Sequence, residues 1–462
     1  MASLIVLGSG PAGLMAAHEL ARAGHDCLVL EASTAVGGMA GSFEVAGQRV
    51  DHGSHRLHPA APAPILRLIG QLLGSDLQRR PRNGRLRLAD RWVGFPLRTA
   101  GLLRTLPPGL TARLTVDSMA GVARSLRSGP APETFDEAIE ATLGPTVGRL
   151  FYGPYADKLY GTPARELDAD LARRRVSAAS PLDIARRLAR ARRPAGREFL
   201  YPRRGSGQIV ERLAEAATDA GAEIRLGQPV TAVEVGADGV SVGTPNGHHR
   251  ATTALSTLPG RRLADLLDPD PPAEVTAALA RQRTRAMLLV YLVVERARYS
   301  PFDAHYVPGP ETPISRLSEP KNYRDGDDPP DRTVLCAEIP CWPDDDIVGW
   351  TADDLAALVG DGLHRLGLPP ARPVAVEVRH LPSVYPVFDR AGREDRAVVG
   401  RWQAGTGPVV SLGRQGLGVI DNLHHVLEMG AEAAAAIDAD GTLAAERWAG
   451  ALARFATNTV ED

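Results

Sequence analysis

Three glycines near the start of this 462-residue chain constrain its fold more than any other feature. In SLIVLGSGPAGLMAAHELARAG, an apolar strand runs into Gly8, Gly10 and Gly13, and a helical pattern then ends at Gly24. The first glycine permits a tight turn, the second lets the backbone approach a pyrophosphate, and the third lets the helix pack closely on the strand. We therefore expect an α/β fold with a dinucleotide site at its amino end.

The next predicted strand, DCLVLE, supports this interpretation because it ends in an acid. Glu31 lies 18 residues after Gly13, where a carboxylate accepts both ribose hydroxyls of a dinucleotide. Pro11 and Ala12 open the predicted helix, whose N-terminus faces the phosphates, and Ala32 follows the acid. The alternative is an accidental glycine turn, but the strand, the helix and the acid together favour a cofactor.

A second glycine pair follows at once in EASTAVGGMAGSF. Gly37 and Gly38 lie six and seven residues beyond Glu31, and Met39 comes next. A plain nicotinamide dehydrogenase does not need this pair. The pattern resembles the flavin-binding extension of the amine oxidase superfamily, which includes flavin amine oxidases, protoporphyrinogen oxidases, carotenoid desaturases and UDP-galactopyranose mutases. The resemblance implies FAD as the cofactor, with the chain running back along its pyrophosphate.

Residues 201–259 extend the resemblance into the middle of the chain. They read as a loop, an amphipathic helix and four strands separated by turn signals. The order is similar to the segment that completes the FAD domain in this family, and it implies that the backbone of Val230 contacts the adenine. An unrelated α/β insertion would give the same pattern, so this alternative stays open.

Residues 409–437 carry the third part of the resemblance. A strand leads into a glycine-rich turn, and a helix begins near Asp421 or Asn422. The N-terminus of that helix, including Asn422 and Leu423, would direct positive charge at the flavin pyrimidine ring.

The pair Gly413 and Arg414 resembles the GR of protoporphyrinogen-oxidase-like and mutase-like members. Many amine oxidases have an acid at the second position, so this chain departs from true monoamine oxidases. The turn has no cysteine nearby, which argues against a covalent cysteinyl flavin.

These segments predict two discontinuous domains. A Rossmann-like FAD-binding domain is expected from residues 1–75, 200–260 and 395–462. An inserted α+β substrate-binding domain is expected from residues 76–199 and 261–394. The inserted blocks resemble the superfamily less specifically, although FYGPYADKLYG and HYVPGPETPISRLSEPKNY look like stretches of protoporphyrinogen-oxidase-like proteins.

Two histidines in GSHRLHP, residues 53–59, need an explanation, because the chain has only 12. A metal site would require further ligands at suitable spacing, which the neighbouring sequence does not supply. The longer segment VDHGSHRLHP satisfies both the D-x-G-x-H pattern of desaturases and protoporphyrinogen-oxidase-like enzymes and the G-x-H-x-x-H pattern of mutases. By this resemblance His52, Gly53 and Ser54 border the flavin. We expect His55 near its reactive edge, as a hydrogen-bond partner of N5 or as an acid or base, whereas packed or capping histidines are the alternative.

Aromatic and cationic residues elsewhere are candidates for the substrate pocket, where they would suit an anionic or sugar-like substrate. Ordinary packing or surface placement is the alternative for each. The predicted substrate-binding residues are Arg56, His58, Tyr155, Lys158, Tyr160, Arg316 and Tyr385. The arginine-dense segment 173–204 is predicted to be either a solvated helical face with a loop or an electropositive rim for an anionic substrate or a membrane surface.

Composition excludes several classes of partner. The 53 Lys and Arg residues nearly balance the 55 Asp and Glu residues, so we expect no nucleic acid partner. The longest strong apolar run, AMLLVYLVV, is strand-sized, which predicts no transmembrane segment. The first ten residues lack a charged leader, and the three cysteines form no CxxC pair. A reducing, cytoplasmic location is therefore expected, with no metal site.

Three functions remain open from the sequence. The resemblance favours an FAD-dependent oxidoreductase that takes a hydride from a C–N or C–C bond of a small substrate and passes electrons to oxygen or another acceptor. The second is a mutase-like isomerase in which reduced flavin acts on a nucleotide sugar. The third is a flavoprotein scaffold without turnover. Neither the substrate nor the electron acceptor follows from the sequence.

Overall fold

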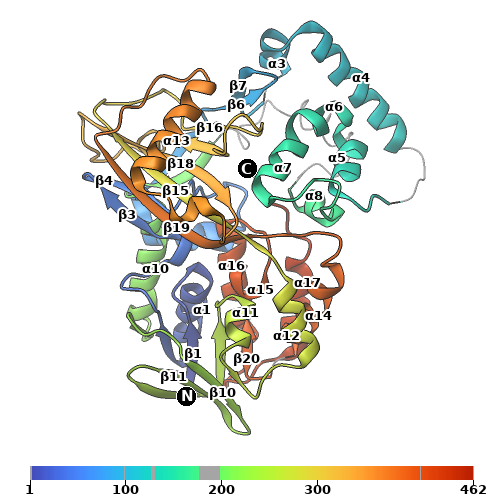
Figure 1. The fold of residues 1–462 in the computed structure, drawn as a ribbon. Coiled ribbons are helices and arrows are strands. Elements are labelled where there is room, and N and C mark those ends of the chain that lie inside the picture. Colours follow the sequence, from blue (N-terminus) through green and yellow to red (C-terminus); the bar gives the residue numbers. More distant parts are fainter. Residues whose placement is uncertain (1–2, 98, 126–130, 176–197, 406, 461–462) are drawn as a thin grey trace.

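The computed structural model describes residues 3–97, 99–125, 131–175, 198–405 and 407–460. It has three parts: a lower α/β layer that holds the N-terminus, an upper sheet whose strands are mostly antiparallel, and an upper group of helices beside that sheet (Figure 1). No helix in the described ranges is long and apolar enough to cross a membrane. The mixed α/β architecture predicted from the glycine pattern is confirmed.

A five-stranded parallel sheet forms the centre of the lower layer, with its strands in the order β20-β13-β1-β2-β9. The strands come from three distant stretches of sequence: β1 (Ser3–Leu7), β2 (Asp26–Leu30), β9 (Glu223–Arg225), β13 (Thr253–Ser256) and β20 (Val409–Ser411). One face is covered by α1 (Pro11–Arg22), α10 (Gly207–Asp219), α16 (Leu423–Ala435) and α17 (Ala445–Phe455). Buried aliphatic side chains of these helices and strands make one continuous core.

The other face of the parallel sheet packs on a smaller sheet with the order β12-β11-β10-β14. Its strands are β10 (Ala232–Gly236), β11 (Gly239–Thr244), β12 (Gly247–Ala251) and β14 (Leu267–Asp268). The stretch after residue 260 stays in this lower layer, since β14 pairs with β10 and α12 (Ala273–Arg281) packs against α14 (Arg393–Ala404). The short α11 (Gly260–Ala264) lies between β13 and β14 in the chain.

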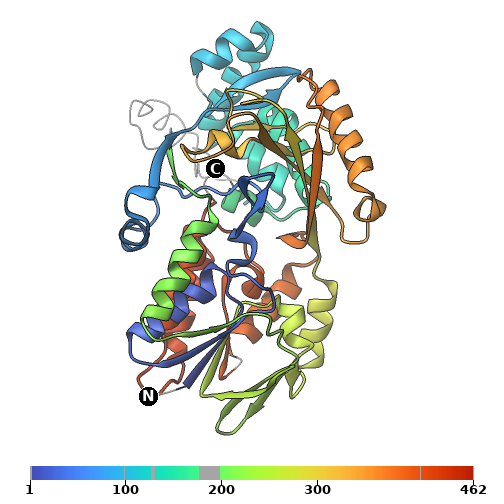
Figure 2. The ribbon, with the colours of Figure 1, turned by 90° about the vertical axis from the view of Figure 1, so that its left-hand side faces the viewer.

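The upper sheet has seven strands in the order β19-β15-β18-β17-β16-β6-β7. They are β6 (Gly84–Leu88), β7 (Arg91–Phe95), β15 (Thr284–Val294), β16 (Ala304–Tyr306), β17 (Arg316–Ser318), β18 (Thr333–Cys341) and β19 (Ala375–Pro386). The apolar run AMLLVYLVV is the buried central strand β15. Helix α13 (Ala352–Arg365) covers the outer face of this sheet (Figure 2).

The inner face of the upper sheet packs on the hairpin formed by β3 (Ser42–Val45) and β4 (Gln48–Asp51). Connecting segments are α2 (Ala63–Leu73), the paired strands β5 (Leu77–Pro81) and β8 (Glu198–Pro202), and the one-turn helices at Gly38–Ala40, Gly74–Asp76, Pro320–Asn322 and Asp346–Gly349.

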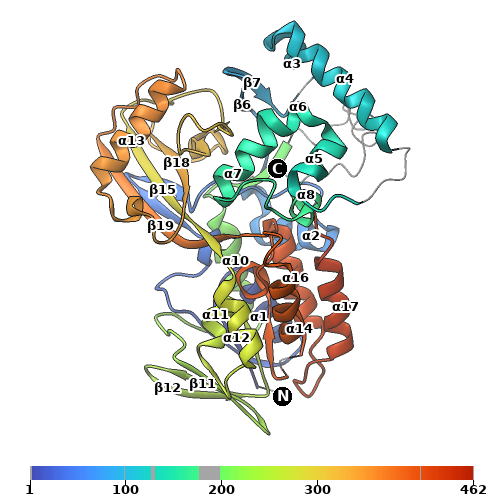
Figure 3. The same ribbon diagram turned by 45° about the vertical axis from the view of Figure 1, so that its right-hand side comes forward.

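The upper helices stand beside the sheet (Figure 3). They are α3 (Thr99–Thr105), α4 (Pro108–Ser125), α5 (Phe135–Leu143), α6 (Pro145–Val147), a π-helical turn (Gly148–Tyr152), α7 (Gly153–Tyr160) and α8 (Ala169–Arg175). Asp168, at the start of α8, is fully buried and binds Arg393 and Arg396 of α14 at 2.9 Å each. This ion-pair cluster ties the upper helices to the lower layer.

Close contact between α1 and α16 depends on Gly430. A Cβ atom added there would lie 2.3 Å from the carbonyl oxygen of Ala12 and 2.8 Å from the Cβ of Met15. Both contacts are with rigid parts of α1, so the neighbouring helix would have to move.

We predict that Gly430→Ala lowers the free energy of unfolding, by about 1–3 kcal/mol as for other overpacked sites. Gly400→Ala is the matched control, because Gly400 also lies in a helix but a Cβ there meets nothing within 4 Å. The control should be neutral or stabilised by up to about 1 kcal/mol. Equal effects of the two substitutions in denaturant unfolding would contradict this account of the α1–α16 contact.

Candidate functional site

One cavity lies along the carboxyl ends of all five parallel strands, and we call it the cofactor cavity. It takes in about 1090 Å³ of space, part of which is open to solvent. Ligands of open α/β sheets bind at this edge because the strand order reverses there. It is lined by Gly8, Gly10, Pro11, Ala12, Leu30, Glu31, Ala32, Gly38, Met39, Ala40, His55, Gln228, Val230, Thr257, Leu258, Pro259, Gly413, Arg414, Gln415, Leu423 and Val426.

The glycine turn shapes the middle of the cofactor cavity. Gly8 has φ of +100°, a left-handed conformation that favours glycine, and a Cβ on Gly13 would lie 2.1 Å from the Gly8 carbonyl oxygen. A Cβ on Gly10, in contrast, would meet nothing within 4 Å, so the space beside it is open. Helix α1 begins after Gly10 without a side-chain cap. Its first N–H groups are therefore directed at this space.

The second glycine pair packs directly on the first turn. The Gly37 amide donates to the Ser9 carbonyl at 2.9 Å, and a Cβ on Gly38 would lie 3.7 Å from the Gly10 Cα. Gly37 has φ of +110° and Gly38 has φ of +51°. The pair thus closes the cavity over the glycine turn, with Gly38 on the lining and Gly37 behind it.

Glu31 is held in place at one end of the cavity. Its Oε2 accepts hydrogen bonds from the amide and hydroxyl of Ser9 at 2.8 Å each, and its Oε1 accepts from the amide and hydroxyl of Ser33 at 2.9 Å each. Burial alone would raise the pKa of Glu31, but these four hydrogen bonds hold it below its ordinary value of 4.5. The carboxylate is therefore ionised and rigidly oriented.

The loop after β4 brings His55 to the other end of the cavity. The His55 Nε2 lies 2.9 Å from the carbonyl oxygen of His52. Because a carbonyl oxygen only accepts, Nε2 carries the proton, and Nδ1 of the neutral ring is left as an acceptor. His52 itself stacks on Phe43, with ring centroids 5.0 Å apart, behind the cavity wall.

The surroundings of His55 favour its neutral form. Burial lowers the pKa of His55 below 6.5, Asp51 and the His52 carbonyl oppose this shift, and the charges of Arg414 and Arg316 add to it. The imidazole is therefore neutral at pH 7.

Arg414 and Asp421 form a buried ion pair at the His55 end of the cavity. The Arg414 Nε donates to Asp421 Oδ1 at 2.6 Å, and its Nη2 donates to the Asp421 carbonyl oxygen at 2.7 Å. Burial raises the pKa of Asp421, while Arg414 and Arg175 oppose the shift. The pair lies just before α16, whose first residue, Leu423, also lines the cavity.

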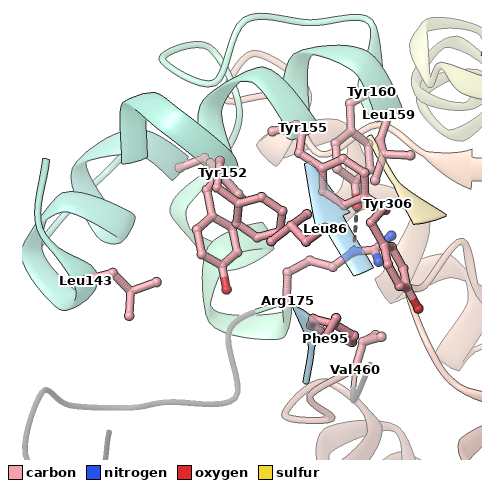
Figure 4. A pocket seen from close by; sticks show the side chains of 13 residues that line it. Leu86, Phe95, Leu143, Tyr152, Tyr155, Leu159, Tyr160, Arg175, Tyr306 and Val460 are labelled. Carbon is pink, nitrogen blue, oxygen red and sulfur yellow. Dashed lines mark hydrogen bonds between the residues drawn. The ribbon is translucent and has the colours of Figure 1, made fainter. Parts of the chain in front are cut away.

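A second cavity lies between the upper helices and the upper sheet, and we call it the aromatic cavity. Its side chains point inward from both walls (Figure 4). On the helical wall Phe151 stacks on Tyr155, with centroids 5.6 Å apart and planes 14° apart. On the sheet wall Phe95 lies 5.0 Å from Tyr306. The lining is Leu86, Phe95, Phe135, Leu143, Phe151, Tyr152, Tyr155, Ala156, Leu159, Tyr160, Arg175, Tyr306 and Val460.

Side chains at the border of the two cavities interact electrostatically, and we call this interaction the connection between them. Arg175 lines the aromatic cavity, its Nε donates to the Tyr160 hydroxyl at 2.8 Å (Figure 4), and its guanidinium lies 5.3 Å from the ring centroid of Tyr385. The charge of Arg175 also acts on Asp421, the partner of Arg414.

The cofactor cavity gathers most of the cofactor-binding residues predicted from the sequence. Gly13, Gly37, His52, Gly53, Ser54 and Asn422 lie behind its lining, in the turns that carry the lining residues. Their predicted contacts with FAD, and that of Val230 with the adenine, stay predictions.

Of the predicted substrate-binding residues, Tyr155 and Tyr160 line the aromatic cavity and Tyr385 lies beside it. The others do not line it. The Lys158 ammonium donates to the carbonyls of Val307 and Ile314 at 2.7 and 3.0 Å, and burial lowers the pKa of Lys158 to about 8. It thus fastens α7 to the loop between β16 and β17.

Arg56, Arg316 and His58 also have other partners. The Arg56 guanidinium lies between the rings of Phe199 and Tyr323, at 4.8 and 4.7 Å. Arg316 forms a two-point ion pair with Glu338, and His58 accepts a hydrogen bond from the amide of Ala60 at 3.1 Å. Their predicted contacts with substrate stay predictions.

Sequence reasoning missed several lining residues. Gln228, Thr257, Leu258, Pro259 and Gln415 follow strands β9, β13 and β20. The rule that ligands bind at the carboxyl ends of parallel strands would have identified them. In the aromatic cavity Phe95, Phe151, Tyr152, Arg175 and Tyr306 were missed, because they come from four separated places that only the tertiary fold brings together.

The predictions for the arginine-dense segment concern mainly residues 176–197, which lie outside the described residues. Among the residues that the structure does describe, no group of three or more His, Cys, Asp or Glu side chains could hold a metal ion.

Comparison with known proteins identifies the family. Residues 11–403 match the model of the flavin containing amine oxidoreductase family. The chain belongs to this family. It is accordingly a flavoprotein of an oxidoreductase family, and its cofactor is FAD.

The sequence identity to an individual relative is low. A putative flavin-containing monoamine oxidase AofH of Mycobacterium tuberculosis is 28% identical over 287 residues, which cover 59% of this chain and 60% of that protein. The matched region thus spans less than two thirds of the relative.

Two solved structures show the same fold. A reduced UDP-galactopyranose mutase superposes with a TM-score of 0.79 over 99% of both chains at 18% identity. A putative protoporphyrinogen oxidase from Exiguobacterium sp. 255-15 gives a TM-score of 0.72 over 94% of this chain and 98% of its own at 20% identity.

The residues of the cofactor cavity fit FAD. The open space beside Gly10 and the uncapped start of α1 suit a pyrophosphate, and the ionised Glu31 suits a ribose. The Oε1 atom of Gln228 is buried in this lining without a hydrogen-bond partner in the described part of the chain, as expected for a group that awaits a ligand.

We predict that Gly10→Glu yields a folded protein without flavin. The new side chain would fill the open space and place a negative charge where the pyrophosphate binds. The measurements are the flavin absorbance of the purified protein and its far-UV circular dichroism, with Gly400→Ala as a control that keeps its FAD. A Gly10→Glu protein that purifies with a full complement of flavin would remove our assignment of the pyrophosphate site.

We predict that His55 contributes to stability only while it is neutral. Its folded pKa is below 6.5, so the unfolded chain binds more protons as the pH falls through 6.5 toward the folded pKa, and the free energy of unfolding decreases over that window. His55→Ala should retain FAD and show a shallower decrease in denaturant unfolding between about pH 5 and pH 8. The same pH dependence in both proteins would show that His55 is not held neutral by the fold.

Proposed function

We propose that this oxidoreductase removes a hydride from a C–N or C–C bond of a substrate bound in the aromatic cavity. The proposal depends mainly on the aromatic lining of this cavity and on the electrostatic interaction of its Arg175 with Asp421, the ion-pair partner of Arg414 in the cofactor cavity. A substrate that fills the aromatic cavity and reaches this connection would present its reacting carbon at the His55 end of the cofactor cavity.

The bound FAD supplies the redox chemistry by accepting two electrons with the hydride. The residues of the chain supply a proton acceptor and the charges that surround the reaction. The neutral His55 can accept a proton or a hydrogen bond at Nδ1. The cationic members of two ion pairs, Arg414 and Arg316, lie near the same end of the cavity, as their effect on the pKa of His55 indicates. Positive charge there stabilises the negative charge that develops on reduction.

The lining of the aromatic cavity supports a substrate with a planar or apolar body. Tyr155 and Phe151 offer a stacked aromatic wall, and Phe95 and Tyr306 offer a second one. Arg175 suits an anionic group on the part of the substrate nearest the connection. Electron transfer from the reduced cofactor to oxygen or to another acceptor belongs to the same proposal.

A mutase-like isomerisation of a nucleotide sugar is the second candidate function. The stacked pair of Phe151 and Tyr155 favours it, because every nucleobase has a face that stacks on an aromatic ring. However, Arg175 is the one cation among the described residues that line the aromatic cavity. A diphosphate calls for more positive charge than this, so we place oxidation first.

The domain organisation that serves this function is also a proposal. We propose that residues 1–75, 200 to about 282 and 395–462 bind the cofactor. The boundary predicted at residue 260 thereby moves to about residue 282. The pairing of β14 with β10 and the packing of α12 on α14 support this change. Residues 76–199 and the stretch from about 283 to 394 would then enclose the substrate.

The decisive experiment separates the two reactions by their dependence on the redox state. We expect the oxidised holoenzyme to be bleached anaerobically by a donor from a panel of amines, porphyrinogens and aromatic acids, and to take up oxygen or reduce a dye in the presence of that donor. The dithionite-reduced holoenzyme is offered UDP-sugars under argon. A sugar that isomerises only with the reduced enzyme and with no net electron flow would overturn the proposal in favour of the mutase.

The same assay tests the aromatic cavity. Tyr155→Ala should raise the KM for the donor about two- to tenfold, as expected from the loss of a stacking contact of about 0.5–1.5 kcal/mol. Its FAD content should not change. Trp350→Ala is the control, since Trp350 is 45% exposed and lines neither cavity. An unchanged KM in Tyr155→Ala would place the substrate elsewhere.

A further inference from the structure

Glu338 is a buried carboxylate on the central strand β18, and the reaction described above assigns it no role. Its side chain is only 4% exposed. It binds Arg316 of the neighbouring strand β17 at two points: Nε donates to Oε1 at 2.9 Å, and Nη2 donates to Oε2 at 2.8 Å. Such a pair is rigid because both side chains are planar and each fixes the other.

The same carboxylate also holds the loop that carries His55. The amide of Ser54 donates to Glu338 Oε1 at 3.0 Å, although the two residues are 284 positions apart. The Ser54 hydroxyl lies 2.5 Å from the Tyr323 hydroxyl, and the Tyr291 hydroxyl donates to the Asp51 carbonyl at 2.6 Å. The backbone before His55 is therefore attached to the upper sheet.

Arg316 extends this arrangement toward the aromatic cavity. Its guanidinium lies 5.9 Å from the ring centroid of Tyr306, which lines the aromatic cavity. Its charge also acts on His55, which lines the cofactor cavity. Glu338 therefore makes direct hydrogen bonds to Arg316, which lies beside a lining residue of the aromatic cavity, and to the backbone amide that precedes His55.

We propose that Glu338 is a positioning residue that fixes Arg316 and the Ser54 backbone in one geometry and thereby links the aromatic cavity to His55. It offsets the charge of Arg316 and fixes the position of the His55 loop at the cofactor cavity. The link to substrate rests on the proposed function, since it requires that the aromatic cavity holds the substrate. The effect of Glu338 on His55 and on the cofactor does not depend on the proposed function.

Energetics favour a functional role for this pair. Burying two charges removes their hydration at a large energetic cost, and apolar side chains of similar size often stabilise a fold as well or better. The seven-stranded sheet has a continuous apolar core on its outer face that needs no such pair. A charged pair at the boundary of two cavities is therefore better explained by what it orients than by the stability it adds.

The test compares substitutions of Glu338 with a matched buried carboxylate. Glu338→Gln keeps an oxygen for the Ser54 amide but leaves Arg316 uncompensated, whereas Glu338→Ala removes both functions. Glu319→Gln is the control: Glu319 is 1% exposed, accepts hydrogen bonds from the amides of Tyr299 and Ser300, and lines neither cavity. The measurements on each holoenzyme are the flavin midpoint potential, the NMR titration of His55 and the melting temperature.

We expect Glu338→Gln to shift the midpoint potential to more positive values and the titration of His55 to lower pH, because the full charge of Arg316 then acts on both. Glu319→Gln should change neither, whatever its melting temperature. The double variant Glu338→Gln/Arg316→Met should return both quantities toward the wild type. Glu338→Ala should in addition weaken FAD binding, since it releases the Ser54 amide.

Equal losses of melting temperature in Glu338→Gln and Glu319→Gln, with the potential and the titration of His55 unchanged, would overturn the proposal and leave Glu338 a structural residue. If Glu338→Gln does not fold, Arg316→Met decides instead. It should move the titration of His55 to higher pH, and no movement would overturn the proposal. None of these measurements uses a substrate, so a wrong assignment of the reaction would leave their outcome intact.

Discussion

The contact between α1 and the turn before it is the constraint on which the rest of the structure depends. A Cβ at Gly13 would lie 2.1 Å from the carbonyl of Gly8, so only glycine lets the helix start this close to the strand. The helix N-terminus then faces the edge where five parallel strands end. The same closeness is required on the other side of α1, where Gly430 lets α16 approach Ala12. Two helix starts, those of α1 and α16, are thereby brought to one cavity.

Around that cavity, desolvation and charge pairing act together. Glu31 is ionised because four hydrogen bonds outweigh its burial. His55 is neutral because burial and two arginines outweigh Asp51. Arg414 and Arg316 are each paired with one buried carboxylate, Asp421 and Glu338 respectively. The cavity is therefore asymmetric, with an ionised carboxylate fixed at one end and a neutral histidine beside two paired arginines at the other. A dinucleotide with a ribose at one end and a reducible ring at the other suits this asymmetry.

Much of this half of the molecule could be predicted from the sequence because its signals are local. The spacing of Gly8, Gly10 and Gly13, the acid at Glu31 and the second glycine pair each act on neighbours within a few residues. The structure confirms the strands and helices predicted from them. The predicted cationic substrate residues show the opposite case. Lys158 finds backbone carbonyls 149 and 156 positions away, and Arg316 finds Glu338 across paired strands. Residue type indicated charge near the cavities, but only the fold determines which charges are already neutralised.

The aromatic cavity could not be predicted for a related reason. Its two walls come from β7 and β16 on one side and from the helical turn and α7 on the other, and no sequence period links them. The fold alone does not choose between oxidation and isomerisation, because one architecture hosts both among its structural relatives. The difference must come from charge at the substrate: a nucleotide diphosphate needs several cations at once, whereas a single Arg175 among aromatic rings suits a molecule with one anionic group. The paired state of Arg316 strengthens this argument, since an arginine already held by Glu338 at two points has less to offer a phosphate.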